Sequence, residues 1–321
     1  MALIADVAGG NTIAGGLLAA LLVAPADAVE PAPQRPPAVE TAIAQVNGEP
    51  IFQRELDREL APAARLLDPR ATLPAEVRQR ALDQLIDRRL IVKYLTEQKL
   101  AASDQDVDLE IGRLKRRLEA QEKKLAEHLQ AGGLTEDDLR RDIRWRLSWQ
   151  RYLDGKLTDE NLQKYFEKHR REFDGTELKV AHLLIKPANA ADPISVDEAQ
   201  HKATSLRRQI DAGELTFADA CRQHSQAPTA KSGGDIGFIR RHEPMPDSFS
   251  AAAFALEEDQ VSQPVQTKFG IHLIRVLEVK PGQRPWEESR GELRSAVTQY
   301  LFRWIAQKER ETAQVEIVLL R

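Results

Sequence analysis

The first half of the chain is patterned mainly for helices. A short apolar run over Ala42–Val46, closed by the turn-forming pair Asn47-Gly48, predicts a strand. Beyond it, leucine and isoleucine recur three and four residues apart, as on the buried face of a helix. This spacing, with capping boxes that begin at Ser103 and Thr135, predicts helices over residues 53–67, 74–99, 103–131, 135–152 and 158–171.

The C-terminal end repeats the helical pattern and adds a strand. Residues 286–312 carry leucine, valine and isoleucine on one helical face, and residues 315–319 are typical of a strand. Because a strand needs a partner to be stable, we expect this last strand to pair with Ala42–Val46. The two ends of the chain would then build one mainly helical module.

Between these ends, two predicted strands each carry a histidine within an apolar run. They are His182-Leu183-Leu184-Ile185 and His272-Leu273-Ile274-Arg275-Val276. A single histidine of this kind is usually a hydrogen-bonded core residue. Two of them in matching strands also fit a facing pair, in which each imidazole fixes the tautomer of the other. Thr267, five residues before His272, supplies a hydroxyl for such a pair.

Around these strands, residues 179–280 carry a series of motifs in a fixed order. They include Phe217-Ala218-Asp219-Ala220, Gly233-Gly234-Asp235, Ala253-Phe254 and Phe269-Gly270-Ile271-His272. In this order and spacing the segment resembles the parvulin family of peptidyl-prolyl cis/trans isomerases. The resemblance implies a four-stranded antiparallel sheet with surrounding helices, inserted in the helical module, so the expected fold class is α+β.

The resemblance also implies a candidate site. His182 and His272 match the family's histidine pair, with Thr267 beside them. The side chains that match the apolar pocket for the substrate proline ring, or that extend it as substrate contacts, are Ile236, Phe238, Met245 and Phe249.

One position departs from the family pattern. Seven residues before Gly234 the family usually has Cys or Asp facing the reacting amide, whereas this chain has Ala227. The polar contribution then comes from the histidine and threonine network or from Ser225, or is missing, so weak catalysis is expected. Cys221, the only cysteine, lies six residues too early to fill this position. As a nucleophile it lacks a placed base, and with His224 it makes only half of a metal site.

Prolyl isomerisation needs no metal or cofactor, and we expect none. The family's phosphate-selective members carry a basic loop after the first histidine strand, but here residues 186–193 hold one cation, Lys186, and one carboxylate. Phosphate recognition favours a fork of arginine donors. The pairs Arg207-Arg208 and Arg240-Arg241 are interpreted as solvated surface. Ordinary, non-phosphorylated X-Pro bonds are therefore the expected substrates.

Charge and the N-terminal pattern narrow the choice of partners. The 46 basic and 50 acidic residues are mixed along the chain and give a net charge of −4, so no nucleic-acid partner is expected.

An apolar run over residues 13–24, followed by Ala26-Asp27-Ala28, is typical of a signal peptide, although no Lys or Arg precedes it. We expect a signal segment over 1–28, with transient membrane association, and a proline-rich linker over 29–41. The expected location is the periplasm or another extracytoplasmic compartment.

The whole arrangement resembles the exported foldases of the SurA and PrsA type, in which helices from both chain ends form a chaperone module around an inserted isomerase domain. We expect that module over 42–175, the isomerase domain over 176–282, and a completing helix and strand over 283–321. The expected function is prolyl isomerisation and chaperoning of unfolded or nascent exported polypeptides. The alternative is a holding chaperone whose parvulin-like domain binds peptide with little or no catalysis. Trp145 and Trp149 either face clients or lie in the core.

Overall fold

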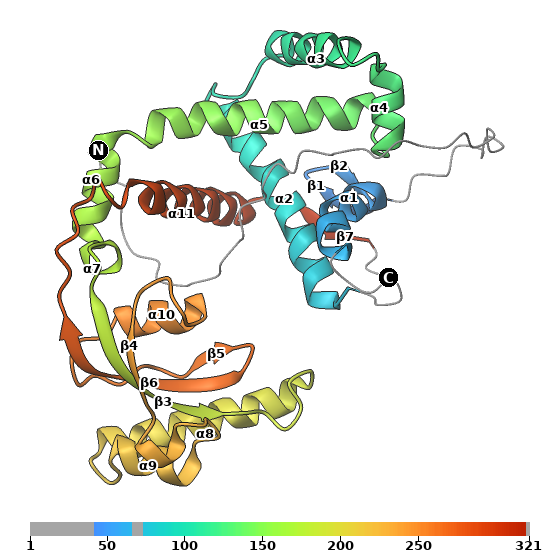
Figure 1. The fold of residues 1–321 in the computed structure, drawn as a ribbon. Coiled ribbons are helices and arrows are strands. Elements are labelled where there is room, and N and C mark those ends of the chain that lie inside the picture. The colour runs from blue at the N-terminus through green and yellow to red at the C-terminus, as the bar shows by residue number, and fades with distance from the viewer. Residues whose placement is uncertain (1–41, 66–72, 319–321) are drawn as a thin grey trace. The chain divides into compact units, whose positions relative to one another are not determined.

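The described part of the chain divides into two compact units. The structure, a computed structural model, describes residues 42–65 and 73–318 (Figure 1). Of these, residues 160–295 form one unit, here called the inserted unit. Residues 42–159 and 296–318 form the other, here called the terminal unit. The segments 1–28 and 29–41, expected to be a signal and a linker, lie outside the described residues.

The terminal unit combines a small sheet with helices from both ends of the chain. Its elements are β1 (Ala42–Val46), β2 (Glu49–Phe52), α1 (Gln53–Ala64), α2 (Ala75–Glu97), α3 (Asp104–Glu119), α4 (Leu125–Ala131), α5 (Glu136–Lys156), residues 296–310 of α11 (Arg290–Arg310), and β7 (Val315–Ile317). The antiparallel sheet has the order β2-β1-β7. The predicted pairing of the first and last strands is confirmed, with Gln45 opposite Glu316.

Helix α11 joins the terminal unit through contacts with α2. The Lys93 ammonium lies 3.0 Å from the Glu309 carboxylate, and Arg310 Nε donates to Asp87 over 2.6 Å. Tyr94 meets the ring of Trp304 edge-on, with centroids 6.3 Å apart. The C-terminal helix is therefore part of this unit, as its apolar face predicted.

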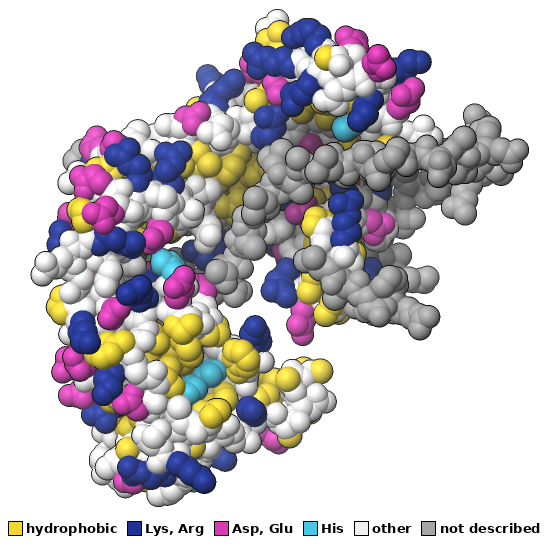
Figure 2. All heavy atoms as spheres, in the orientation of Figure 1, with side chains coloured by type: hydrophobic (Ala, Val, Ile, Leu, Met, Phe, Trp, Pro, Cys, Tyr) yellow, Lys and Arg dark blue, Asp and Glu magenta, His cyan; other side chains and the backbone are white. Residues whose placement is uncertain are grey.

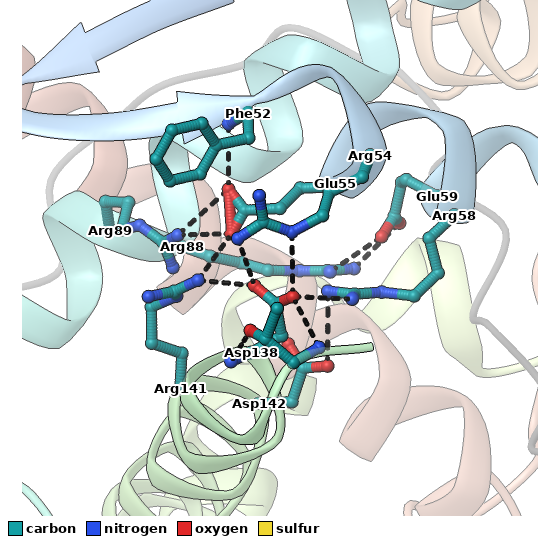
Figure 3. A network of polar contacts seen from close by, with 11 residues as sticks. Phe52, Arg54, Glu55, Arg58, Glu59, Arg88, Arg89, Asp138, Arg141 and Asp142 are labelled. Atoms are coloured by element: carbon teal, nitrogen blue, oxygen red, sulfur yellow. Dashed lines mark hydrogen bonds and ion pairs between the residues drawn. The ribbon is translucent and has the colours of Figure 1, made fainter. Parts of the chain in front are cut away.

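Two buried carboxylates connect α1, α2 and α5 (Figure 3). Asp138 is fully buried and accepts hydrogen bonds from Arg54 Nε at 2.9 Å, from the Thr135 amide at 3.0 Å, and from Arg141. Glu55 accepts from Arg89 Nη2 at 2.7 Å and from the Phe52 amide at 3.2 Å. Charge-assisted bonds of this kind hold the pKa of Asp138 far below its usual range, although burial alone would raise it.

Two predicted helices are each broken once. Residues 103–131 form α3 and α4 rather than one helix, because Glu122 takes a left-handed conformation (φ 58°) and the Lys123 amide bonds back to the Leu118 carbonyl. Residues 158–171 likewise divide at His169 into α6 (Asp159–Lys168) and α7 (Arg170–Phe173). The leucine spacing continued through the first break, so it carried no sign of the turn. Helix α1 also ends earlier than predicted, at Ala64, and α11 starts at Arg290 rather than at residue 286.

The inserted unit contains the predicted four-stranded antiparallel sheet. After α6 and α7 follow β3 (Glu177–Ile185), α8 (Pro193–Asp211), α9 (Phe217–His224), a 3-10 turn (Ala230–Ser232), β4 (Asp235–Ile239), α10 (Asp247–Phe254), β5 (Val265–Thr267) and β6 (Gly270–Lys280). The strand order is β4-β3-β6-β5. Helices α8 and α9 cover one face and α10 covers the other (Figure 1).

Within the described ranges, each helix is too short or too polar to cross a membrane.

Asp138→Ala should lower the free energy of unfolding by about 3–5 kcal/mol, because the surrounding guanidinium groups lose a buried countercharge. Asp137→Ala, its exposed neighbour on α5, should change it by less than about 0.5 kcal/mol. Urea unfolding of both variants measures the difference. Equal losses in the two variants would contradict the structural role given to Asp138.

Candidate active site

The pairing of β3 with β6 brings the two strand histidines together. His182 lies opposite Ile274, and His272 lies opposite Leu184, so the histidines occupy diagonal positions on one face of the sheet. Their rings are nearly parallel, with centroids 5.4 Å apart and an interplanar angle of 16°. Both are buried, with 8% and 3% of their surface exposed.

A chain of hydrogen bonds connects the histidines to Thr267. His182 Nδ1 lies 3.2 Å from His272 Nδ1, and His272 Nε2 lies 2.8 Å from Thr267 Oγ1. The threonine oxygen also accepts from the Phe269 amide at 3.1 Å. Two tautomers fit the chain: either the Thr267 hydroxyl donates to His272 Nε2 and His272 Nδ1 donates to His182, or His182 Nδ1 donates to His272 and His272 Nε2 donates to Thr267.

Burial keeps both imidazoles neutral. It is the main cause that lowers the pKa of His272 to about 4, and repulsion from His182 lowers that pKa further. Burial also lowers the pKa of His182. Phe249 of α10 adds to the apolar surroundings, since its ring meets both imidazoles edge-on at 5.7 and 5.4 Å. Such a neutral pair can donate and accept hydrogen bonds, but it brings no charge near neutral pH.

Three of the four apolar candidates, Ile236, Met245 and Phe249, lie on the histidine side of the sheet. Phe249 is fully buried and belongs to the core cluster under α10, so it forms a floor of the site rather than an open wall. Ile236 and Met245 pack against the same cluster and are partly exposed. Figure 2 shows hydrophobic side chains gathered around histidine atoms on this face of the inserted unit.

Phe238 lies opposite Lys179 and next to Ile239 of the histidine-side cluster, so the alternation of side chains places its ring on the other face of the sheet, apart from the site. It is 37% exposed, and Lys280 Nζ lies 3.5 Å from the centre of its ring.

Ser225 and Ala227 belong to a segment that lies along β3. Ser225 Oγ accepts from the amides of Leu184 and Ala227, at 3.1 and 3.2 Å. The neighbouring Gln226 bonds to β3 twice, through its amide to the Leu184 carbonyl and through Oε1 to the Lys186 amide. Among the described residues, the Ser225 hydroxyl therefore bonds to backbone and not to either histidine. This arrangement braces β3 beside the site.

The Gly233-Gly234-Asp235 turn packs against the backbone of His182. Gly234 has φ 85°, and a Cβ added there would lie 2.5 Å from the His182 carbonyl oxygen, so only glycine fits. Cys221 lies behind the same residue, with Sγ 3.5 Å from that oxygen. The thiol is fully buried, and burial raises its pKa to about 12. Cys221 is therefore not a thiolate nucleophile at neutral pH.

The interpretation of the arginine pairs as solvated surface is wrong for one member of each pair. Arg208 and Arg240 are exposed, but the side chains of Arg207 and Arg241 are only 25% and 12% exposed. Arg241 donates to Glu172 and to Asp247, over 2.8 and 2.6 Å. Local sequence gives no signal for the first of these bonds, because its partners lie 69 residues apart.

The low pKa of His272 predicts a loss of stability on acidification. The unfolded chain takes up a proton near pH 6.5 and the folded chain only near pH 4, so stability is complete above pH 6.5 and falls as the pH drops toward 4. His272→Gln cannot take up this proton, and from pH 7 to pH 5 it should lose about 2 kcal/mol less than the parent. Urea unfolding at the two pH values measures this. Equal acid losses would show that His272 is charged in the folded state or exposed.

Comparison with known proteins gives two family matches in the chain. Residues 182–278 match the PPIC-type PPIASE domain, the rotamase family, and residues 19–153 match the SurA-like N-terminal domain. The chaperone SurA of Alkalilimnicola ehrlichii is 27% identical over 83% of this chain and 62% of its own length. The foldase protein PrsA of Clostridium botulinum is 27% identical over 78% of each chain. The crystal structure of the peptidylprolyl isomerase PrsA from Bacillus anthracis is 24% identical, covers 72% of this chain and 95% of its own, and has a TM-score of 0.37.

The chain spans between 59% and 65% of the length of the first SurA relatives that it matches. Its two matched segments correspond to the two units of the structure, since residues 182–278 lie in the inserted unit and the described part of 19–153 lies in the terminal unit. The chain thus carries a parvulin-type isomerase domain of the PPIC class together with a SurA-like N-terminal domain, and it is homologous to the SurA chaperones and the PrsA foldases.

Proposed function

We propose that this protein is a peptidyl-prolyl cis/trans isomerase that also acts as a folding chaperone. The observation that carries the proposal is the site itself, in which His182, His272 and Thr267 form one hydrogen-bonded chain above the buried ring of Phe249. The match of residues 182–278 to the rotamase family supports it. Ala227 remains a departure from the family pattern, so we propose modest catalysis.

Prolyl isomerisation requires a site with a suitable shape and polarity, because the reaction is a rotation about one bond. Rotation about an X-Pro bond faces about 18–20 kcal/mol, because amide resonance is lost in the twisted transition state. The twisted amide is less dipolar than the planar one, so an apolar slot made by Ile236, Met245 and Phe249 favours it. The neutral histidine pair can orient a donor without placing a charge in that slot. No metal or cofactor takes part in this mechanism.

The proposed substrates are non-phosphorylated X-Pro bonds. Tight phosphate recognition favours arginine forks, and the partly buried Arg241, in the loop before α10, already bonds to the carboxylates of Glu172 and Asp247. The loop after β3 offers one cation, Lys186. A phosphoserine before the proline would therefore gain little here.

A partly exposed aromatic cluster supports a chaperone surface on the terminal unit. Trp145 and Trp149 stack along α5 with centroids 5.5 Å apart, and Phe302 of α11 meets both edge-on. Neither indole is buried in the core. Large, rigid aromatic side chains of this kind suit extended, apolar client segments.

The names of the relatives, chaperone SurA and foldase protein PrsA, support unfolded polypeptides as clients, and we propose that these are exported or nascent chains. We propose an extracytoplasmic location, with residues 1–28 as the signal segment. The second candidate function is a holding chaperone whose parvulin-like domain binds peptide with little catalysis, and Ala227 is the residue that favours it. Turnover of a proline peptide separates the two.

Thr267→Val should lower kcat/KM for a short proline peptide about tenfold, since it removes the hydroxyl that orients His272 and costs about 1.4 kcal/mol of transition-state stabilisation. The control is Thr204→Val on α8, whose exposed hydroxyl bonds to the Gln200 carbonyl and whose loss should leave activity unchanged. A protease-coupled isomerisation assay gives both rates. A Thr267→Val variant as fast as the parent would rule out the proposed network. An inactive parent would favour the second candidate function, a holding chaperone.

Replacing Trp145 and Trp149 together by alanine should abolish most suppression of aggregation of a proline-poor unfolded client, while prolyl isomerisation stays at the parent rate. Trp286→Ala, a partly exposed tryptophan of the inserted unit, serves as the control. Light scattering of a diluted, denatured client measures the effect. Full suppression by the double variant would place the client surface elsewhere.

A further inference from the structure

Helix α10 supplies the floor of the candidate site, and two neighbouring residues of α7 are connected to its two ends, one through Arg241 and the other through Leu256, two residues after the helix. At the C-terminal end, Arg171 Nη1 donates to the Leu256 carbonyl over 2.6 Å. At the N-terminal end, Asp247 accepts from Arg241 Nη1, and Arg241 Nε donates to Glu172 over 2.8 Å. Arg171 and Glu172 are consecutive in the chain. One turn of helix therefore fixes both ends of α10.

The bridge from Glu172 through Arg241 to Asp247 is partly buried, and both carboxylates bond to the guanidinium group. The side chain of Arg241 is 12% exposed, and those of its partners Glu172 and Asp247 are 30% and 19% exposed. Glu172 has a second partner, His169 Nδ1, at 3.0 Å. Although burial raises it, bonds from His169 and Arg241 hold the pKa of Glu172 below its usual range. An ionised, doubly bonded carboxylate in this position gives Arg241 a fixed anchor.

These bonds involve the loop and the helix that carry two of the apolar residues of the candidate site, Met245 and Phe249. Arg241 lies in the loop between β4 and α10, and the same loop carries Met245. Asp247 is the first residue of α10, two positions before Phe249, whose ring touches both imidazoles. The histidines lie on β3 and β6, so Arg241 sets where Met245 and Phe249 stand relative to them.

Helix α7 lies outside the segment that matches the isomerase family. That match begins at residue 182, whereas α7 is Arg170–Phe173 and belongs to the same compact unit. It also lies before residue 176, where the sequence placed the start of the isomerase domain. The residues that contact the loop and helix of the candidate site therefore include some that precede the matched segment.

We propose that α7 is a positioning element of the isomerase site, and that Glu172 and Arg241 set its affinity for proline peptides by fixing the loop of Met245 and the helix of Phe249. This proposal rests on the proposed isomerase function. Without the bridge, loop and helix are free to shift, and a peptide must order them when it binds. The cost falls on binding, since the histidine chain on β3 and β6 is left unchanged.

The test uses the full chain and a matched pair of neighbouring arginines. Arg241→Gln should raise KM for a proline peptide about tenfold with kcat within about twofold of the parent. Arg240→Gln removes an exposed arginine, 67% exposed and paired only with Glu177 among the described residues, and should change neither constant. Glu172→Gln, a near-isosteric change, should raise KM as Arg241→Gln does, and the double variant should show no further rise.

Two results would overturn the proposal. One is an unchanged KM in folded Arg241→Gln or Glu172→Gln protein. If the thermal stability falls while KM stays the same, the bridge stabilises the fold but does not position the site. The other is additive effects in the double variant. If the parent proves inactive, the proposed isomerase function fails separately, and the same variants are compared by the Kd of a labelled proline peptide. Weaker binding by Arg241→Gln than by Arg240→Gln then supports the positioning role, and equal binding refutes it.

Discussion

The antiparallel pairing of β3 with β6 is the constraint on which the inserted unit depends. It runs from Glu177 opposite Lys280 to Ile185 opposite Ile271, with one irregularity near Lys179. Because side chains alternate between the two faces of a strand, a slip of either strand by one residue would send its histidine to the side covered by α8 and α9 and separate the pair. The register of β3 against β6 thus determines which residues form the core, which form the site, and whether the two imidazoles are in contact.

A second pairing gives the terminal unit its topology. Strand β7 follows the inserted unit in the chain but completes a sheet that begins with β1. Closing this sheet joins residues more than 250 positions apart, for which loop entropy grows only slowly with length. The same geometry makes the isomerase domain an insertion, so each unit has its own hydrophobic cluster. The buried bonds around Glu55 and Asp138 then fix three helices against each other.

The sequence was most informative where a pattern is local. The strands at Ala42–Val46 and around His182 and His272, and the capping boxes at Ser103 and Thr135, followed from spacing alone, and the structure shows them. Reading the site needed the family resemblance as well, because a buried histidine by itself is ambiguous.

What the sequence did not predict are features set by distant partners or by backbone turns. The left-handed Glu122 breaks the predicted helix, although the leucine spacing continues through it. Leucine spacing shows which residues are buried, but it does not show where the backbone turns. The sequence predicts a surface position for Arg241, because its acidic partner on α7 is remote in sequence. Phe249 is a floor rather than a wall because burial depends on how α10 packs, which periodicity does not give.

The single thiol of the chain has a consequence for redox chemistry. Exchange with a disulfide needs a thiolate and a path for the attacking sulfur. Cys221 offers neither, since it is fully buried behind His182 and its pKa is raised to about 12. In the folded state the protein is therefore inert toward glutathione and disulfide oxidoreductases. The folded protein thus forms no mixed disulfides, and its structure should not depend on the redox potential of its surroundings.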